Sequence, residues 1–206
     1  MIQINKSPYP EFIEYVKKNK PQNWSELDLE VRTNARKYIL EEEQHNQCAY
    51  TELPLKYENN DSHIEHLKRK NAAFFPRLEF EWSNLFVSCN SDDFGGKYKD
   101  EKYLKGKTKT ENELIINPAL ENPSEYFELT EWGELDVKDD LPDLKRKRAE
   151  VTRDAFNLND PSLKKRRRET IQAVRDYQSG GIDKDMVKEF LSDWGFKSVI
   201  DYELNN

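Results

Sequence analysis

The fold of this chain is decided between Gln44 and Asp100, in three runs: QHNQCAYTELPL (44–55), DSHIEHLKRK (61–70) and EWSNLFVSCNSDDFGGKYKD (81–100). The first two runs are short and bounded by turn-forming residues, which is typical of an irregular hairpin. SNLFVSCN then leads into a glycine-containing loop, and YKDEKYLKG follows with the pattern of a short helix. We therefore expect the order strand, loop, strand, helix, with two of the three histidines in the first half.

The central run places two histidines and a glutamate within four positions. On a strand, alternation puts His63 and Glu65 on one face and His66 on the other, so a bend is needed before Glu65 and His66 can serve one site. Phosphodiester hydrolysis requires an activated water, a cation near the developing charge and help for the leaving oxygen. A histidine beside a carboxylate can supply two of these, Asn84 could orient the imidazole or its backbone, and Lys99 could stabilise phosphate charge. By spacing alone, such a run is more often a polar cluster.

The composition excludes several classes of protein. At 206 residues the chain is long enough for one good-sized domain, or for a smaller domain with a helical extension. With 10 Tyr, 10 Phe and 4 Trp it is too aromatic for a disordered chain. It has no apolar run of about 18 residues and no apolar segment of a signal peptide near its start. We therefore expect a cytoplasmic protein without a membrane span, in which Cys48 and Cys89 are free thiols.

Helices and strands are expected on both sides of the central stretch. Helical periodicity predicts a helix over 26–45 with Ser25 as its N-cap. Residues 113–118 and 126–129 have the pattern of strands. Three helices should follow, the first over about 143–156, the second beginning at Asp160-Pro161 and ending at Gly180-Gly181, and the third beginning at Asp183.

A basic region lies within a chain whose net charge is −7. Between Leu141 and Arg175 there are 11 Lys and Arg against 5 Asp and Glu, a local excess of six. Such a region can hold a strand of nucleic acid or can form two solvated helix faces, and charge alone leaves both open. Our candidates for phosphate contact are Lys164, Arg167 and Arg168, although KKRRR at 164–168 spans more than one helical turn and cannot face one way.

The runs DSHIEHLKRK, WSNLFVSCN and GGKYK together resemble the HNH, or ββα-metal, nuclease motif. Three further runs are similar to segments of the HNH subunits of Septu and retron-associated anti-phage systems (PtuB-like proteins): CAYTELPL, MIQINKSPYPEF and RAEVTRDAFNLNDPSLKKRRRETI. The resemblance covers most of the chain and is least specific over 101–140. It implies an α+β fold with a ββα-metal HNH core, flanking helices and a mainly helical C-terminal region. The expected segments are an arm and helix over 1–45, the nuclease core over 46–110, and strands plus helices over 111–206.

The resemblance also implies roles for individual residues. Glu65, with His63 as a weaker candidate, would bind Mg²⁺ or Mn²⁺, and His66 would deprotonate the attacking water. Asn84 corresponds to the central residue of the motif and Lys99 to its terminal lysine. The family further implies a partner ATPase of the ABC/SMC type (PtuA-like) that gates the nuclease, and nucleic acid, with DNA favoured, as the substrate.

Two departures from the family pattern affect metal binding. Relatives carry two Cys pairs that would hold a structural zinc, whereas here the positions read Cys48, Thr51, Cys89 and Gly95. Two thiolates are half of a tetrahedral site, so we predict no structural zinc and expect apolar packing in its place. Gly96 stands where many HNH enzymes have a second protein ligand, so other side chains, or substrate oxygens and water, would complete the shell.

Three functions remain open from the sequence. The leading one is a metal-dependent endonuclease that acts on DNA within an anti-phage complex. The second keeps this chemistry and changes the substrate to RNA, tRNA included. The third is an HNH fold that has lost catalysis and serves as an interaction subunit. We favour a catalytic function because the chain keeps the candidate catalytic residues of the motif although it lacks two of the four zinc-binding cysteines.

Overall fold

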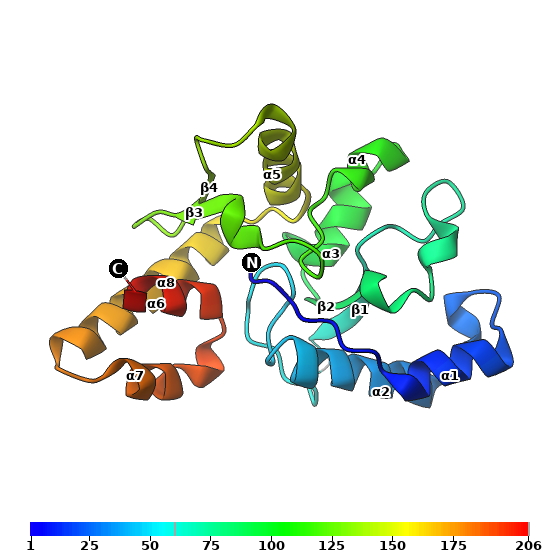
Figure 1. Ribbon diagram of the computed structural model, residues 1–206, viewed down its shortest axis with the longest axis horizontal. Helices are drawn as coiled ribbons and strands as arrows, with labels where there is room; N and C mark the ends of the chain where they lie inside the picture. The colour runs from blue at the N-terminus through cyan, green and yellow to red at the C-terminus, as the bar shows by residue number, and fades with distance from the viewer. Residues whose placement is uncertain (60, 206) are drawn as a thin grey trace.

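The computed structural model describes residues 1–59 and 61–205 and has an α+β fold, as the sequence predicts, with two small antiparallel sheets among helices (Figure 1). The helices are α1 (Pro10–Asn19), α2 (Leu29–Tyr38), α3 (Gly95–Tyr98), α4 (Lys109–Glu113), α5 (Asp143–Ala155), α6 (Pro161–Ser179), α7 (Lys184–Phe190) and α8 (Lys197–Asn205). The strands are β1 (Ser62–His66), β2 (Leu85–Cys89), β3 (Phe127–Leu129) and β4 (Leu135–Val137). Within the described ranges, no helix is both long and apolar enough to cross a bilayer.

The predicted order strand, loop, strand, helix is confirmed from β1 onward, but the irregular hairpin expected of the first two runs is wrong, because residues 44–55 form turns closed by a single bridge between Gln47 and Pro54. β1 pairs antiparallel with β2, so that Ser62 lies opposite Cys89 and His66 opposite Leu85. α3 follows β2, continues as a π-helical turn over Lys99–Tyr103, and packs against both strands. All five residues of β2 are buried. The pair of strands therefore lies inside the molecule, and side chains on β1 are held from several directions.

The first long helix begins later than predicted. α2 starts at Leu29 and continues as a π-helical turn over Ile39–Glu43. Ser25 lies instead in a separate 3-10 turn over Trp24–Glu26, because the Asn23 side chain accepts a hydrogen bond from the Ser25 N–H. That local cap competes with helix initiation, and the chain is extended before α2 begins.

Residues 113–118, which the sequence predicts as a strand, do not form one. A capping box between Thr108 and Glu111 starts α4, and this helix runs to Glu113. The apolar residues that follow are buried without a partner strand, since Thr152 Oγ1 accepts the Ile116 N–H at 2.9 Å. By contrast, the predicted helix starts are confirmed at α6 and α7, where Asp160 and Asp183 cap the first turns.

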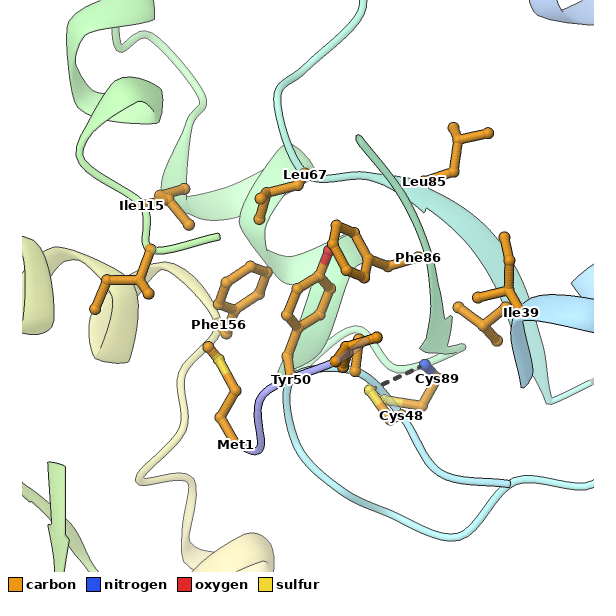
Figure 2. Close-up of a cluster of buried hydrophobic side chains, with 14 of the residues drawn as sticks. Met1, Ile39, Cys48, Tyr50, Leu67, Leu85, Phe86, Cys89, Ile115 and Phe156 are labelled. Atoms are coloured by element: carbon orange, nitrogen blue, oxygen red, sulfur yellow. Dashed lines mark hydrogen bonds between the residues drawn. The ribbon is translucent and has the colours of Figure 1, made fainter. Parts of the chain in front are cut away.

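The main core does not divide at residue 45 or 110. One cluster of buried apolar side chains extends from Met1 to Leu158 and so takes members from all three expected segments. At its centre, Tyr50 stacks on Phe156 with ring centroids 3.8 Å apart and packs against Phe86 (Figure 2). Helices α6, α7 and α8 gather at one end of the molecule (Figure 1) around a smaller cluster of their own.

The C-terminal helices dock on the loop that precedes β1. Gly195 has φ +70°, and a Cβ there would lie 2.3 Å from the carbonyl oxygen of Glu52. The Phe196 N–H donates to that carbonyl at 2.9 Å. The buried Glu52 carboxylate accepts the Ser198 N–H at 2.8 Å and its hydroxyl at 2.6 Å, at the start of α8. Glycine is required at this contact, since any side chain would meet the backbone of the loop.

Candidate active site

A buried ion pair joins β1 to the turn after α3. Lys99 Nζ lies 2.5 Å from Glu65 Oε1, and it also donates to the backbone oxygens of His66 at 2.7 Å and Leu67 at 3.1 Å. Burial raises the pKa of Glu65, but the charge of Lys99, together with hydrogen bonds from His63 and Lys99 and the charge of His63, lowers the pKa to about 2. The structure thus places Lys99 inside the protein with no exposed surface, where it holds Glu65 ionised and does not face solvent as a phosphate ligand would.

Gly96 lets helix α3 approach the Glu65 carboxylate. A Cβ built on Gly96 would lie 2.7 Å from Cγ, Cδ and Oε2 of Glu65. The space that a side chain at position 96 would need is therefore occupied by the glutamate itself. A histidine or asparagine at 96 would have to displace the carboxylate, which gives a physical reason for glycine there.

His63 lies beside Glu65 on the same face of β1, as alternation predicts. Its Nε2 is 3.5 Å from Glu65 Oε2, and its Nδ1 is 2.7 Å from Asn90 Oδ1. Burial lowers the pKa of His63, but hydrogen bonding and charge from Glu65 outweigh this and raise it. With 34% of its side chain exposed, His63 borders a surface hollow that Asn90 and Glu101 also line.

A magnesium ion fits this pair only with help from water or substrate. Among the described residues, no group of three His, Cys, Asp or Glu side chains is placed to hold a metal. Asp92 and Asp93 are exposed and form ion pairs with Lys97 and Lys102. A single ionised carboxylate with one neighbouring ligand nevertheless suits Mg²⁺, which usually keeps several waters. Glu65 Oε2 and His63 Nε2 are therefore the atoms that would hold it.

His66 lies on the opposite face of β1 in an aromatic environment. Its ring meets the edge of Trp24 with centroids 4.7 Å apart, and its Nε2 is 2.9 Å from the Glu79 carbonyl oxygen. A carbonyl only accepts, so Nε2 carries the hydrogen and Nδ1 keeps its lone pair. Burial and then the charge of Lys70 lower the pKa of His66 to about 4, so the ring is neutral near pH 7. Within the described chain, no hydrogen bond or ion pair joins this ring to Glu65.

Asn84 fixes the loop between β1 and β2, and it does so through the backbone. Its Nδ2 donates to the carbonyls of Lys68 and Leu78, both at 3.0 Å, and its Oδ1 accepts the Lys68 N–H at 2.7 Å. The side chain of Asn84 therefore bonds to the backbone of Lys68, two residues after His66, and within the described chain it makes no hydrogen bond to a histidine.

Two further residues position His66, and no sequence pattern marks either of them. Asn112 donates to the Leu67 carbonyl at 3.0 Å and accepts the Arg69 N–H at 2.7 Å, so two buried asparagines bracket the same segment. Glu79 holds the ring through its carbonyl, while its carboxylate accepts the Trp24 N–H at 2.7 Å. Both act across long sequence separations, and neither belongs to a recognisable spacing.

Cys48, Thr51, Cys89 and Gly95, the positions that the resemblance aligns with zinc-binding cysteines, lie together although two of them lack thiols. Thr51 Oγ1 is 3.8 Å from Cys89 Sγ, and the Cys89 N–H donates to Cys48 Sγ at 3.5 Å (Figure 2). A Cβ on Gly95 would lie 3.2 Å from Cys89 Sγ. Hydrogen bonds to sulfur and the apolar packing of Tyr50 connect the segments here.

The basic helix α6 does not present its three candidate residues together. Arg167 is buried, and it donates to the carbonyls of Gly133 at 2.9 Å and Leu158 at 2.7 Å. Lys164 forms an ion pair with Glu134 at 2.7 Å. Arg168 is exposed. The expected phosphate contact does not fit Arg167, because a guanidinium that satisfies two buried carbonyls cannot also reach a strand outside.

Replacing Arg167 by leucine should therefore change stability and leave nucleic-acid binding nearly unchanged. We expect the free energy of unfolding to fall by about 2–4 kcal/mol, because two buried carbonyls lose their donor. Urea denaturation followed by tryptophan fluorescence measures this. Arg168→Ala is the matched control, with an expected change within about 0.5 kcal/mol. A stable Arg167→Leu protein with weakened DNA binding would contradict the structural role.

Comparison with known proteins points in one direction. The chain is 32% identical over 93 residues to the Septu protein PtuB of Bacillus thuringiensis, a match that covers 45% of this chain and 32% of the relative. The chain thus spans about a third of the length of the curated relative that it matches. No protein-family model matches the chain. The similarity supports a Septu-related family.

Proposed function

We propose that this chain is a metal-dependent HNH endonuclease that hydrolyses phosphodiester bonds, with DNA as the favoured substrate, as a subunit of a Septu-type anti-phage defence complex. One observation carries the proposal. On adjacent residues of β1, a neutral histidine with a free Nδ1 lone pair follows a buried carboxylate that is held ionised. A base and a metal-binding group are the two elements that water attack on a phosphodiester needs, and because they lie on opposite faces, a substrate would have to reach both around the end of β1, where His66 is the last residue.

The chain's own residues would divide the work as follows. Glu65 with His63 would hold Mg²⁺ or Mn²⁺, which when bound supplies positive charge for the scissile phosphate. His66 accepts the proton of the attacking water at Nδ1, because its Nε2–H is fixed by the Glu79 carbonyl. Asn84 fixes the backbone after His66. Lys99 acts as a positioning residue that keeps Glu65 ionised.

Removal of the metal tests this assignment. We expect cleavage of nucleic acid with Mg²⁺ or Mn²⁺, and none in excess EDTA. The assay compares duplex DNA, single-stranded DNA and tRNA, each with and without the ABC/SMC-type ATPase that PtuB-like proteins are expected to accompany. Cleavage confined to tRNA would replace the DNA assignment with RNA. Failure on every substrate with the ATPase present would leave the chain as an interaction subunit.

A further inference from the structure

A basic hollow lies between helix α2 and the start of β1. Trp24, Arg32, Arg36, Ser62 and His63 are among the residues that line it. The two arginines are four positions apart on α2, so they lie on one face of the helix. Trp24 also contacts the ring of His66, and His63 contacts Glu65. The hollow thus borders both faces of the candidate active site.

The two arginines differ in how they are used. Arg36 is occupied, because it donates to Ser62 Oγ at 2.8 Å and to the Tyr57 carbonyl at 3.0 Å. Among the described residues, Arg32 makes no side-chain hydrogen bond or ion pair, and its Nε is buried without an acceptor. A buried donor on a charged group that has no partner costs free energy, so an acceptor from outside the chain would stabilise this arrangement.

The surroundings of Arg32 favour an anion. Lys70 lies over the Trp24 ring, 5.1 Å from its centroid, and close enough to Arg32 for the two charges to repel. Burial lowers the pKa of Lys70, and the charge of Arg32 adds to this, while Glu79 opposes both. Glu79 is the carboxylate that pairs with Lys70, at 3.5 Å, and no ion pair within the described chain balances Arg32.

We propose that this hollow binds a phosphate group of a nucleic-acid strand, with the Arg32 guanidinium as its main donor. The inference deepens the proposed nuclease function and rests on it for the identity of the ligand. Arginine presents donors in a fork that matches phosphate oxygens two at a time. A strand held here passes Trp24 on the way to His66 and has His63 at its edge. This assigns the first contact with substrate to α2 and not to the basic helix α6.

Binding without metal tests the site apart from catalysis. The full chain is titrated into a fluorescently labelled single-stranded DNA oligonucleotide in EDTA, and anisotropy is recorded. Arg32→Met keeps the apolar stem of the side chain, and we expect it to weaken binding about tenfold, since a hydrogen-bonded charge contributes about 1.5–3 kcal/mol. Arg32→Lys keeps the charge without the fork and should recover only part of the loss. Lys18→Ala, which removes an exposed charge on α1, should bind as wild type does.

The melting temperatures and DNA affinities of these variants distinguish a phosphate-binding Arg32 from a structural one. The melting temperature of Arg32→Met should equal or exceed that of the wild type, because no internal partner is lost. A clear drop in melting temperature would make Arg32 structural and overturn the proposal. Three other results would also overturn the proposal: DNA affinity of Arg32→Met equal to that of the wild type, an equal loss of DNA affinity in Lys18→Ala, or no DNA binding by the wild type. If inorganic phosphate raises the melting temperature of the wild type but not of Arg32→Met, and both proteins bind DNA equally well, the site binds a free anion and not a nucleic-acid strand. Binding through Arg32 without cleavage in Mg²⁺ would keep this inference and remove the nuclease assignment.

Discussion

Replacing His66 by alanine is expected to lower the rate of nucleic-acid cleavage by about 10²- to 10⁴-fold, the usual contribution of a positioned general base. The ring is the group whose free lone pair can take a proton from water, since its Nε2–H is engaged by the Glu79 carbonyl. Because its pKa is lowered to about 4, His66 is a base throughout the neutral range, and protonation removes activity only as the pH falls toward about 4. The rate of cleavage under single-turnover conditions, measured with Mg²⁺ from pH 4 to 8, checks both statements.

A second substitution separates chemistry from folding. His66→Gln keeps an N–H that can reach the Glu79 carbonyl while it removes the imidazole, and we expect it to be as inactive as the alanine variant. His45→Asn is the matched control, since it removes an exposed histidine and asparagine tolerates the positive φ of 52° at that position. Two folded His66 variants that retain wild-type cleavage would exclude this residue as the base.

Replacing Lys99 by methionine should have the largest effect on stability. The substitution leaves the Glu65 carboxylate buried without its cation, and breaking a buried pair in this way costs about 3–5 kcal/mol. His63 stays beside the carboxylate, but at 3.5 Å and partly exposed it replaces little of the lost charge. Urea denaturation at pH 7 in EDTA measures the change. Adding Glu65→Gln to Lys99→Met removes the uncompensated charge and should recover much of the loss.

The change of the free energy of unfolding with pH should have opposite signs in the wild type and in Lys99→Met. In the wild type the pKa of Glu65 is lowered to about 2, below its value of about 4.3 in the unfolded chain. The resulting stability is complete above about pH 4.3 and is lost as the pH falls through about 2. In Lys99→Met, burial dominates and raises the pKa of Glu65, so acidification should stabilise that variant. A loss under about 1 kcal/mol, or the same pH profile in both proteins, would contradict a desolvated pair.

The parts of the fold that could be predicted from the sequence depend on local signals. Alternation along 62–66 put His63 and Glu65 on one face and His66 on the other, and the aspartates before α6 and α7 marked helix starts that the structure confirms. Where two local signals competed, prediction failed. The apolar run at 113–118 has strand composition, but the capping box at Thr108 starts a helix just before it.

The parts of the site that could not be predicted depend on contacts between distant residues. The run 164–168 consists of five basic residues, and the sequence does not indicate which of them is buried. Arg167 is buried because it donates hydrogen bonds to the carbonyls of Gly133 and Leu158. Asn112 hydrogen-bonds to Leu67, from which it is separated by 45 positions in the sequence. Within the described chain the Nε–H of Arg32 has no acceptor, which no local pattern predicts. Burial of Lys99 follows from the tight approach of α3 at Gly96, which requires the packed structure.

The contact between Glu52 and Ser198 has a consequence for how the protein is made. The two residues are 146 positions apart, so at about 5–20 residues per second a ribosome needs roughly 7–30 s to deliver the second after the first. During that time the Glu52 carboxylate lacks its Ser198 partners, and the Met1 amino group is the partner already made. The same loop carries Tyr50, which packs on Phe86, and Phe86 lies opposite Glu65 in the strand pair. Completion of the candidate site is thus coupled to the synthesis of α8, and a nascent chain without α8 lacks part of the support of the loop that carries Tyr50.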